Sequence, residues 1–374
     1  MKILGIIVEY NPFHNGHLYH LNMAKKITNS DFVVAVMSGN FSQRGTPACL
    51  DKYKRTLIAL QNGVDVVIEL PVLYATSAAR YFALASISIL NNFMVDYICF
   101  GAENSNLEIL QNATIESEEF KEIFKKNLSK GFSYQRAYEK TLEISKNDIK
   151  LSSNNILAIE YLRALKNTNS HIKPFVLQRN EKYTSATEIK KNILNLEKLE
   201  KNVPKETYES IKNTNKNITL DDFTDFFKYK VIQEKENIKK YLDVDEGLEN
   251  RILNNLDSKK NISSMIEVLK TKRYSHFKLQ RMISHIFLNI TKEDMKKYEY
   301  PPYIRILGFK KNSSFLFKNI KNSPLITNIK NAKKILGKDY NLLEKEIFST
   351  EIYNLASKNH DLFHSDYKTP IILS

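Results

Sequence analysis

Two histidines three residues apart are the side chains of this sequence best suited to chemistry. They are His14 and His17, in the segment Asn11-Pro12-Phe13-His14-Asn15-Gly16-His17. An imidazole N–H donates a hydrogen bond to a phosphate oxygen, and a bound phosphate favours the charged form of the ring. Such a pair can stabilise the charge that develops on an α-phosphate during adenylyl transfer, without a covalent intermediate on the enzyme.

The elements around this segment are those that a phosphate site needs. A continuous apolar run at residues 3–8 predicts a buried parallel strand, and a helix is predicted from about residue 16 to 27. A helix N-terminus offers free N–H groups to an anion, and Gly16 allows close approach of the backbone. The alternative is a pair of metal-binding loop histidines, but two histidines without a third ligand make a poor metal site. The pattern favours phosphate.

The first hundred residues alternate between strand and helix. Strands are predicted at residues 3–8, 32–37, 64–69 and 97–100, and helices at about 16–27, 51–61 and 77–90. This spacing predicts an α/β fold with a Rossmann-like parallel sheet and right-handed crossovers. Ligands of such sheets bind at the carboxyl ends of the strands, where the polar segments 9–17, 38–44 and 101–104 lie.

Beyond residue 104 the pattern changes. Residues 105–166 are predicted to be helical, residues 173–178 form a strand, and Ser185 or Thr187 can open a further helix. From about residue 200 no strand–helix alternation is clear, and the chain is predicted to be mainly helical. We therefore expect two domains, a nucleotide-binding domain at residues 1–198 and a basic, mainly helical domain at residues 199–374.

The positive charge is concentrated in the second half. The net charge is +14, and residues 1–200 carry 24 basic and 20 acidic side chains, against 32 and 22 in residues 201–374. Residues 271–340 alone carry 16 basic and 4 acidic side chains. A lysine-rich, solvated surface is the alternative, but the local shortage of acids favours a polyanion such as RNA.

The cysteines and the apolar runs indicate a cytoplasmic protein. Cys49 and Cys99 are far apart and lack ligand spacing, which argues against a disulfide framework or a structural zinc site. The apolar N-terminus reaches Glu9 too early for a signal peptide, and no apolar run approaches the roughly 20 residues that span a bilayer. We expect no membrane partner, and the sequence does not indicate the oligomeric state.

Several long motifs occur in order along most of the chain, although the match is loose between residues 200 and 265. They are GIIVEYNPFHNGH (5–17), MSGNFSQRG (37–45), FGAE (100–103), NNILAIEY (154–161), SATEI (185–189), KRY (272–274) and RILGF (305–309). The HxGH segment after the first strand resembles the nucleotidylyltransferases related to class I aminoacyl-tRNA synthetases. More closely, the sequence resembles the bacterial tRNA(Met) cytidine acetate ligases.

The resemblance implies a reaction and an ATP site. Acetate and ATP give acetyl-adenylate and pyrophosphate, and the acetyl group then passes to N4 of the wobble cytidine of elongator tRNA(Met), giving N4-acetylcytidine. The ATP site would be completed by Gly101, by Asn154 or Asn155, and by Arg179. His14 and His17 would stabilise the transition state, and the loop that cradles ATP would comprise Ile7, Val8, Glu9, Tyr10, Asn11, Pro12, Phe13, His14, Asn15, Gly16, His17, Leu18, Tyr19 and His20.

The residues outside the loop leave alternatives open. Arg179 follows a predicted strand and can bind phosphate through two hydrogen bonds, or it can be a surface arginine. One of Asn154 and Asn155 can cap the helix that begins near Ile156 while the other contacts the ligand. The residues themselves do not decide which.

The segment around Ser185 and Thr187 is a second phosphate candidate. Hydroxyls and free N–H groups at a helix start can hold the outer phosphates. Lys190 stands where the family pattern has arginine, which keeps the charge but loses the planar guanidinium. Mg²⁺ is expected to organise the triphosphate, but no carboxylate cluster identifies its protein ligands.

A basic and aromatic segment is predicted to bind tRNA. Rings stack on unpaired bases while lysine and arginine bind phosphate. An amphipathic helix with Phe277, Met282 and Ile283 in the core is the alternative, and we expect both to hold. The predicted tRNA-binding residues are Lys272, Arg273, Tyr274, Lys278 and Arg281.

Other charged residues near the site carry weaker predictions. The loop at residues 38–44 can close over acetate, or Arg44 can reach the tRNA, and an ordinary strand–helix loop is the alternative. Lys52 and Arg55 are expected on a solvated helix face. Two rival functions remain: an adenylyltransferase for a small cofactor precursor, which needs no long basic extension, and a nucleotide-sensing RNA-binding module without turnover.

Overall fold

The fold is known from a computed structural model. The structure describes residues 1–132, 134–144, 152–214, 217–245, 247–257, 259–320, 323–358 and 362–374. None of the helices in these ranges is both long enough and apolar enough to cross a membrane.

A central sheet is the core of the molecule. Its order is β5-β4-β1-β2-β3-β6-β7, with β8 paired to β6. Neighbouring strands are parallel except β3 and β6, which are antiparallel. The predicted α/β class with a Rossmann-like parallel sheet is therefore confirmed. The strands are β1 (Ile3–Val8), β2 (Phe32–Ser38), β3 (Val66–Leu70), β4 (Tyr97–Ala102), β5 (Lys173–Gln178), β6 (Ile304–Phe309), β7 (Leu325–Ile326) and β8 (Ile372–Leu373).

The strand order reverses next to β1. From β1 the chain adds β2 and β3 on one side, and then β4 and β5 on the other. The loops after β1 and β4 therefore diverge at their carboxyl ends and leave a crevice, which is where sheets of this kind bind ligands. The HxGH segment follows β1 and Gly101 lies in β4, so both predicted ATP elements border this crevice.

Both faces of the sheet are buried, as apolar parallel strands require. Successive side chains of β2 point to opposite faces. Val34 and Val36 pack in the core that includes α4 and α8, whereas Val33, Ala35 and Met37 pack in the core that includes α1 and α2.

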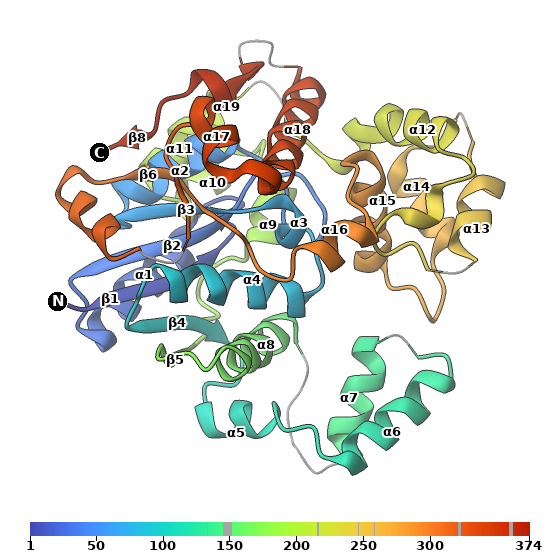
Figure 1. The fold of residues 1–374 in the computed structure, drawn as a ribbon, viewed down its shortest axis with the longest axis horizontal. Coiled ribbons are helices and arrows are strands. Elements are labelled where there is room, and N and C mark those ends of the chain that lie inside the picture. Colours follow the sequence, from blue (N-terminus) through green and yellow to red (C-terminus); the bar gives the residue numbers. More distant parts are fainter. Residues whose placement is uncertain are drawn as a thin grey trace.

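The helices of the first half surround these strands (Figure 1). The hairpin of α6 and α7 projects away from the sheet on the side of α5 and α8. These helices are α1 (Asn15–Thr28), α2 (Lys52–Gln61), α3 (Val72–Ala75), α4 (Ala79–Asn92), α5 (Leu107–Asn112), α6 (Glu118–Ser129), α7 (Tyr134–Ile144), α8 (Ser153–Asn167), α9 (Ala186–Lys191), α10 (Leu196–Asn202) and α11 (Lys205–Lys212).

The second half first forms a helical lobe and then returns to the sheet. The lobe, at the right of Figure 1, contains η1 (Leu220–Phe223), α12 (Thr224–Gln233), η2 (Ile238–Lys240), α13 (Leu248–Asn254), α14 (Ile262–Leu269), α15 (His276–Phe287) and α16 (Lys292–Lys297). The last part adds η3 (Lys311–Asn319), η4 (Ile329–Asn331), α17 (Ala332–Leu336), η5 (Gly337–Asp339), α18 (Tyr340–Ser357) and α19 (Ser365–Lys368).

The strands of the second half are not predicted by the sequence. β6 pairs with β3, with Arg305 opposite Glu69, and so extends the sheet of the first half. The β6 sequence is short and contains an arginine, and its partner strand β3 lies more than two hundred residues earlier in the chain. No local pattern therefore predicts it. The division at residue 198 into an ATP-binding and a tRNA-binding domain stays a prediction about function.

Candidate functional site

The two histidines of the HxGH segment are held by the start of helix α1. His14 is its N-cap, and the ring Nδ1 of His14 accepts a hydrogen bond from the Gly16 N–H at 3.0 Å. The ring Nδ1 of His17 lies 3.4 Å from the His14 backbone N, which donates to it. Because each Nδ1 accepts, the ring proton of each neutral histidine is on Nε2. The Nε2–H of His14 can therefore donate to a ligand, whereas the ring N–H of His17 also has the backbone oxygen of Pro12 as an acceptor.

The two rings lie close together. Their centroids are 3.8 Å apart with an interplanar angle of 30°. Tyr10 and Phe13 pack against His17, with centroids at 5.1 and 5.9 Å, and both are fully buried. The aromatic residues of the segment therefore fix the imidazoles rather than contact solvent.

Gly16 is required by the histidine cap itself. A Cβ at this position would lie 2.8 Å from Cε1 and 3.0 Å from Nδ1 of His14, and 3.2 Å from the Cβ of Tyr183. Any larger residue would push the His14 ring from its bond to the Gly16 N–H. The sequence assigned Gly16 to close approach of a ligand, and the structure adds this internal reason.

Burial keeps the histidines neutral in the unliganded protein. It lowers the pKa of His14 to about 4, with a further contribution from the charge of Arg179. Burial, followed by His14, His20 and Arg179, lowers the pKa of His17 well below its ordinary value. Burial also lowers the pKa of His20 to about 4, and its buried Nε2 has no partner within the described residues. At pH 7 the rings are neutral donors, and charge can come only with an anionic ligand.

Residues from three elements meet on the other side of the crevice. A Cβ on Gly101 would lie 3.6 Å from Cγ of Arg179 and 3.9 Å from Cδ2 of His20. The structure thus brings together His20 of α1, Gly101 of β4 and Arg179 after β5, as the sequence predicts. These distances are ordinary van der Waals contacts, so Gly101 lies between the side chains of His20 and Arg179.

Glu103 links three residues on this side of the site, and sequence reasoning assigned it no role. Its carboxylate accepts from Nδ2 of Asn154 at 2.6 Å and from the Ser152 hydroxyl, and lies 3.6 Å from Nη1 of Arg179. Burial would raise the pKa of Glu103, but the bonds from Ser152 and Asn154 lower it. A carboxylate beside Arg179 orients the guanidinium and competes with a phosphate for it.

The two asparagines have different surroundings. Ser152 caps α8, so neither Asn154 nor Asn155 does. Asn155 is buried, and its Oδ1 accepts from the backbone N–H of Asn104 at 3.0 Å, which ties α8 to the loop after β4. Asn154 lies on the exposed side with Glu103. Asn154 is therefore the better placed of the two to contact a ligand.

The segment from Tyr183 to Thr187 lies beside the start of α1. The rings of Tyr183 and Tyr19 are 5.3 Å apart. Ser185 caps α9 by accepting from the Glu188 N–H, whereas Thr187 is exposed. Their contact with the outer phosphates stays a prediction.

The predicted tRNA-binding residues differ in their exposure and in whether a carboxylate pairs with them. Lys272 and Arg273 are exposed, but Tyr274 is only 8% exposed and cannot offer its ring face to a base. Lys278 pairs with Asp245, and Nε of Arg281 lies 3.2 Å from Oδ2 of Asp243. The lobe's own contacts therefore already engage Tyr274, Lys278 and Arg281.

The prediction of a solvated face for Lys52 and Arg55 is wrong. Both side chains have no exposed surface. Arg55 donates to the backbone oxygens of Leu50, Glu9, Ser38 and Gly39, and so joins the carboxyl ends of β1 and β2 behind the ATP loop. A buried arginine can be kept in this way because its nitrogens donate four hydrogen bonds to backbone oxygens.

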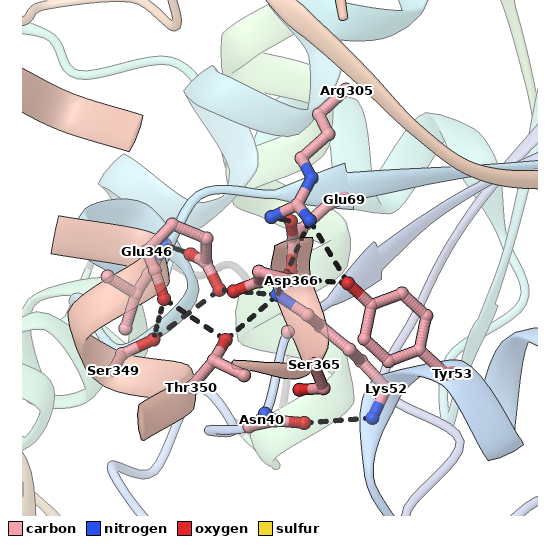
Figure 2. A network of polar contacts seen from close by, with 12 residues as sticks. Asn40, Lys52, Tyr53, Glu69, Arg305, Glu346, Ser349, Thr350, Ser365 and Asp366 are labelled. Atoms are coloured by element: carbon pink, nitrogen blue, oxygen red, sulfur yellow. Dashed lines mark hydrogen bonds and ion pairs between the residues drawn. The ribbon is translucent and has the colours of Figure 1, made fainter. Parts of the chain in front are cut away.

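Lys52 belongs to a buried charged cluster that joins the two halves of the chain (Figure 2). Its Nζ lies 2.7 Å from Glu69, 2.8 Å from Asp366 and 3.6 Å from Glu346. Arg305 contacts the same Glu69 and Asp366, each at 2.6 Å. We call Lys52, Glu69, Arg305, Glu346 and Asp366 the charged cluster.

The charges of the charged cluster balance if Glu346 is protonated. Burial, with the neighbouring Glu69, raises the pKa of Glu346 to about 8. Burial opposes ionisation of Asp366, but Arg305 and Lys52 hold its pKa well below its usual range. Two cations then face two carboxylates, and the protonated Glu346 accepts from the Val72 N–H at 2.5 Å.

Replacing Glu346 with glutamine is expected to flatten the pH dependence of stability between about pH 4.5 and 8. Because the pKa of Glu346 is raised on folding, the folded chain holds a proton that the unfolded chain has released, and the free energy of unfolding falls as pH rises toward 8. Glutamine keeps the shape and cannot titrate. Denaturant unfolding at several pH values measures this, with Glu344→Gln on the exposed face of α18 as control. Equal slopes in Glu346→Gln and the unmodified protein would contradict it.

The described residues contain no group of three or more His, Cys, Asp or Glu side chains arranged to hold a metal ion.

Known proteins match the chain over its length. The HIGH Nucleotidyl Transferase family matches residues 1–367. The tRNA(Met) cytidine acetate ligase of Thermoanaerobacter sp. (strain X514) is 39% identical, with 100% of both chains covered. The enzyme of that name from Caldicellulosiruptor saccharolyticus is 40% identical, over 96% of this chain and 95% of the relative.

A solved structure matches the fold as well. The crystal structure of Thermotoga maritima TmcAL bound with alpha-thio ATP has a TM-score of 0.92 and 30% sequence identity, covering 100% of this chain and 99% of that chain. The apo form of the same protein also has a TM-score of 0.92, at 28% identity. The chain therefore belongs to the HIGH nucleotidyl transferase family and, within it, to the tRNA(Met) cytidine acetate ligases.

Proposed function

We propose that this protein activates acetate with ATP and acetylates a cytidine of elongator tRNA(Met) at N4, in the cytoplasm. The observation that carries the first step is the pair of neutral imidazoles at the start of α1, whose Nδ1 atoms accept backbone N–H groups, so that each ring proton is on Nε2. The membership of the chain in a family of acetate ligases supports the choice of acetate and tRNA(Met).

In the first step an acetate oxygen attacks the α-phosphorus of ATP, and the bond to pyrophosphate breaks. His14 and His17 donate from Nε2 to phosphate oxygens whose negative charge increases in the transition state. Arg179 balances charge from the other side of the crevice. Mg²⁺ accompanies the triphosphate and neutralises part of its charge.

In the second step N4 of cytidine attacks the carbonyl carbon of acetyl-adenylate, and the bond to AMP breaks. N4 is a weakly nucleophilic amine, so it requires acetate in an activated form. The leaving AMP remains within reach of the donors that held it in the first step. One site therefore serves both steps, provided that the tRNA delivers its cytidine to the same crevice.

The direct test uses purified protein, ATP, Mg²⁺, labelled acetate and bulk bacterial tRNA. Digestion of the tRNA is expected to release labelled N4-acetylcytidine only when ATP is present. Acetate-dependent exchange of label between pyrophosphate and ATP measures the first step alone. Exchange with cofactor precursors, and none with acetate, would instead identify the small-molecule adenylyltransferase. ATP binding without either reaction would identify the non-catalytic module.

Replacing Arg273 with alanine is expected to weaken tRNA binding and its salt dependence. Arg273 is exposed, and within the described residues its side chain has no ion pair. Loss of one phosphate contact lowers the slope of log affinity against log salt by roughly 0.7–0.9. Filter binding at several salt concentrations measures the slope, and Arg273→Lys should retain it. An unchanged slope in Arg273→Ala would remove Arg273 from the interface.

A further inference from the structure

The loop after β2 contacts the lobe at several points, one of which is an arginine on an aromatic ring. The Cζ atom of Arg44 lies 4.4 Å from the ring centroid of Phe277, the second residue of α15. The Phe277 ring is 39% exposed, contrary to the core position expected from the sequence. Arg44 is half-buried, and no carboxylate pairs with it in the part of the chain that the structure describes. A cation and an aromatic ring thus share one face without an anion.

The contact is fixed by the backbone on both sides. Gly45 has a φ of 75°, and a Cβ there would lie 2.8 Å from Cα and 3.0 Å from N of Arg281. The hydroxyl of Ser284 donates to the Gly45 oxygen at 2.5 Å. Loop and helix therefore touch backbone to backbone at Gly45, and the side chains of Arg44 and Phe277 are held in register.

The same loop reaches the ATP segment. The Gln43 N–H donates to Oε1 of Glu9 at 2.7 Å, and Asn11 accepts from the Cys49 N–H at 2.9 Å. The loop directly follows β2, and β2 neighbours β1 on the side away from β4. Arg44 and Phe277 therefore lie on the side of the HxGH segment that Gly101 and Arg179 leave free.

The neighbouring cations show why this pair stands out. Lys278 and Arg281 are neutralised by Asp245 and Asp243, and the ring of Tyr274 is covered. Arg44 combines a free charge with a planar group that stacks on bases and also binds phosphate. Unpaired nucleotides bind to exposed aromatic rings beside cations, because the flat face of any base can stack on the ring.

We propose that Arg44 and Phe277 form a stacking platform for one unpaired nucleotide of the acceptor RNA. The base lies on the exposed part of the platform, and a phosphate of the same strand pairs with Arg44. This inference rests on the proposed function. Since Gly45 joins the platform to the loop that holds Glu9, RNA bound there lies at a fixed position relative to the ATP segment.

The test separates RNA binding from acetate activation. In Arg44→Gln and in Phe277→Leu the dissociation constant for tRNA is expected to rise roughly tenfold, as loss of a stacked base does. Only Arg44→Gln should also lower the salt slope, by about 0.7 for a single-stranded contact. Acetate-dependent pyrophosphate exchange should stay within about twofold of the unmodified protein in both.

Matched variants make the result decisive. Arg44→Lys keeps the charge but not the plane, so it should keep the salt slope while losing affinity. Phe348→Leu, on an exposed ring of α18, and Lys26→Gln, on the exposed end of α1, should bind tRNA normally. Unchanged tRNA affinity in Arg44→Gln and Phe277→Leu, or an equal fall in exchange and binding, would make the pair a structural contact only. No acetylcytidine from the unmodified protein would instead overturn the proposed function.

Discussion

Replacing His14 or His17 with alanine is expected to slow acetate-dependent pyrophosphate exchange by about 10²- to 10³-fold, because each change removes one preorganised donor to the α-phosphate. The affinity for tRNA should not change, since both rings lie at the start of α1 and not on the lobe. Initial rates of exchange at saturating ATP measure the first effect, and filter binding measures the second.

Two amide variants distinguish donation from helix capping. An asparagine amide reaches about the position of Nδ1, and a glutamine amide reaches about that of Nε2. If His14 acts through its free Nε2–H, His14→Gln should recover more activity than His14→Asn. Recovery in His14→Asn alone would show that the residue acts by accepting from Gly16, as an N-cap does. Exchange at the unmodified rate in His14→Ala would remove His14 from catalysis altogether.

Replacing Arg305 with methionine is expected to lower the free energy of unfolding by about 3–5 kcal/mol, the usual result of removing one partner from a buried ion pair. Glu69 and Asp366 would keep only Lys52 as a cation, in a site that water does not reach. Denaturant unfolding at pH 7 measures the loss.

The matched control is Arg273→Met, on the exposed turn before α15. Its effect on stability should stay within about 0.5 kcal/mol, as for most surface substitutions. A loss below about 1 kcal/mol in Arg305→Met would contradict the importance of the charged cluster. It would show that the remaining groups of the cluster rearrange or change protonation to compensate.

The sequence predicts what depends on neighbouring residues. β1 and β5 have the predicted bounds, and His14, Gly16 and His17 occupy the strand-to-helix turn that their spacing indicates. These features follow from local periodicity and capping, which a single sequence contains.

What the sequence does not predict depends on residues far apart in the chain. Lys52 and Arg55 have the spacing of a solvated helix face, and only the arrival of Asp366, Thr350 and four backbone oxygens explains their burial. The role of Glu103 likewise requires α8 to bring Asn154 beside it. Phe277 has an apolar side chain at a helical position, and its exposure is set by the lobe's packing.

The antiparallel seam between β3 and β6 has a consequence for synthesis. A growing chain presents β3 as an open sheet edge until residues 304–309 appear, which takes tens of seconds at roughly 5–20 residues per second. Asp366, the carboxylate that Lys52 and Arg305 share, appears later still. A nascent or prematurely ended chain therefore carries the complete HxGH segment on an unfinished sheet. A fragment that ends before residue 304 would therefore lack the strand that pairs with the β3 edge and the Arg305 and Asp366 side chains that contact Lys52 and Glu69.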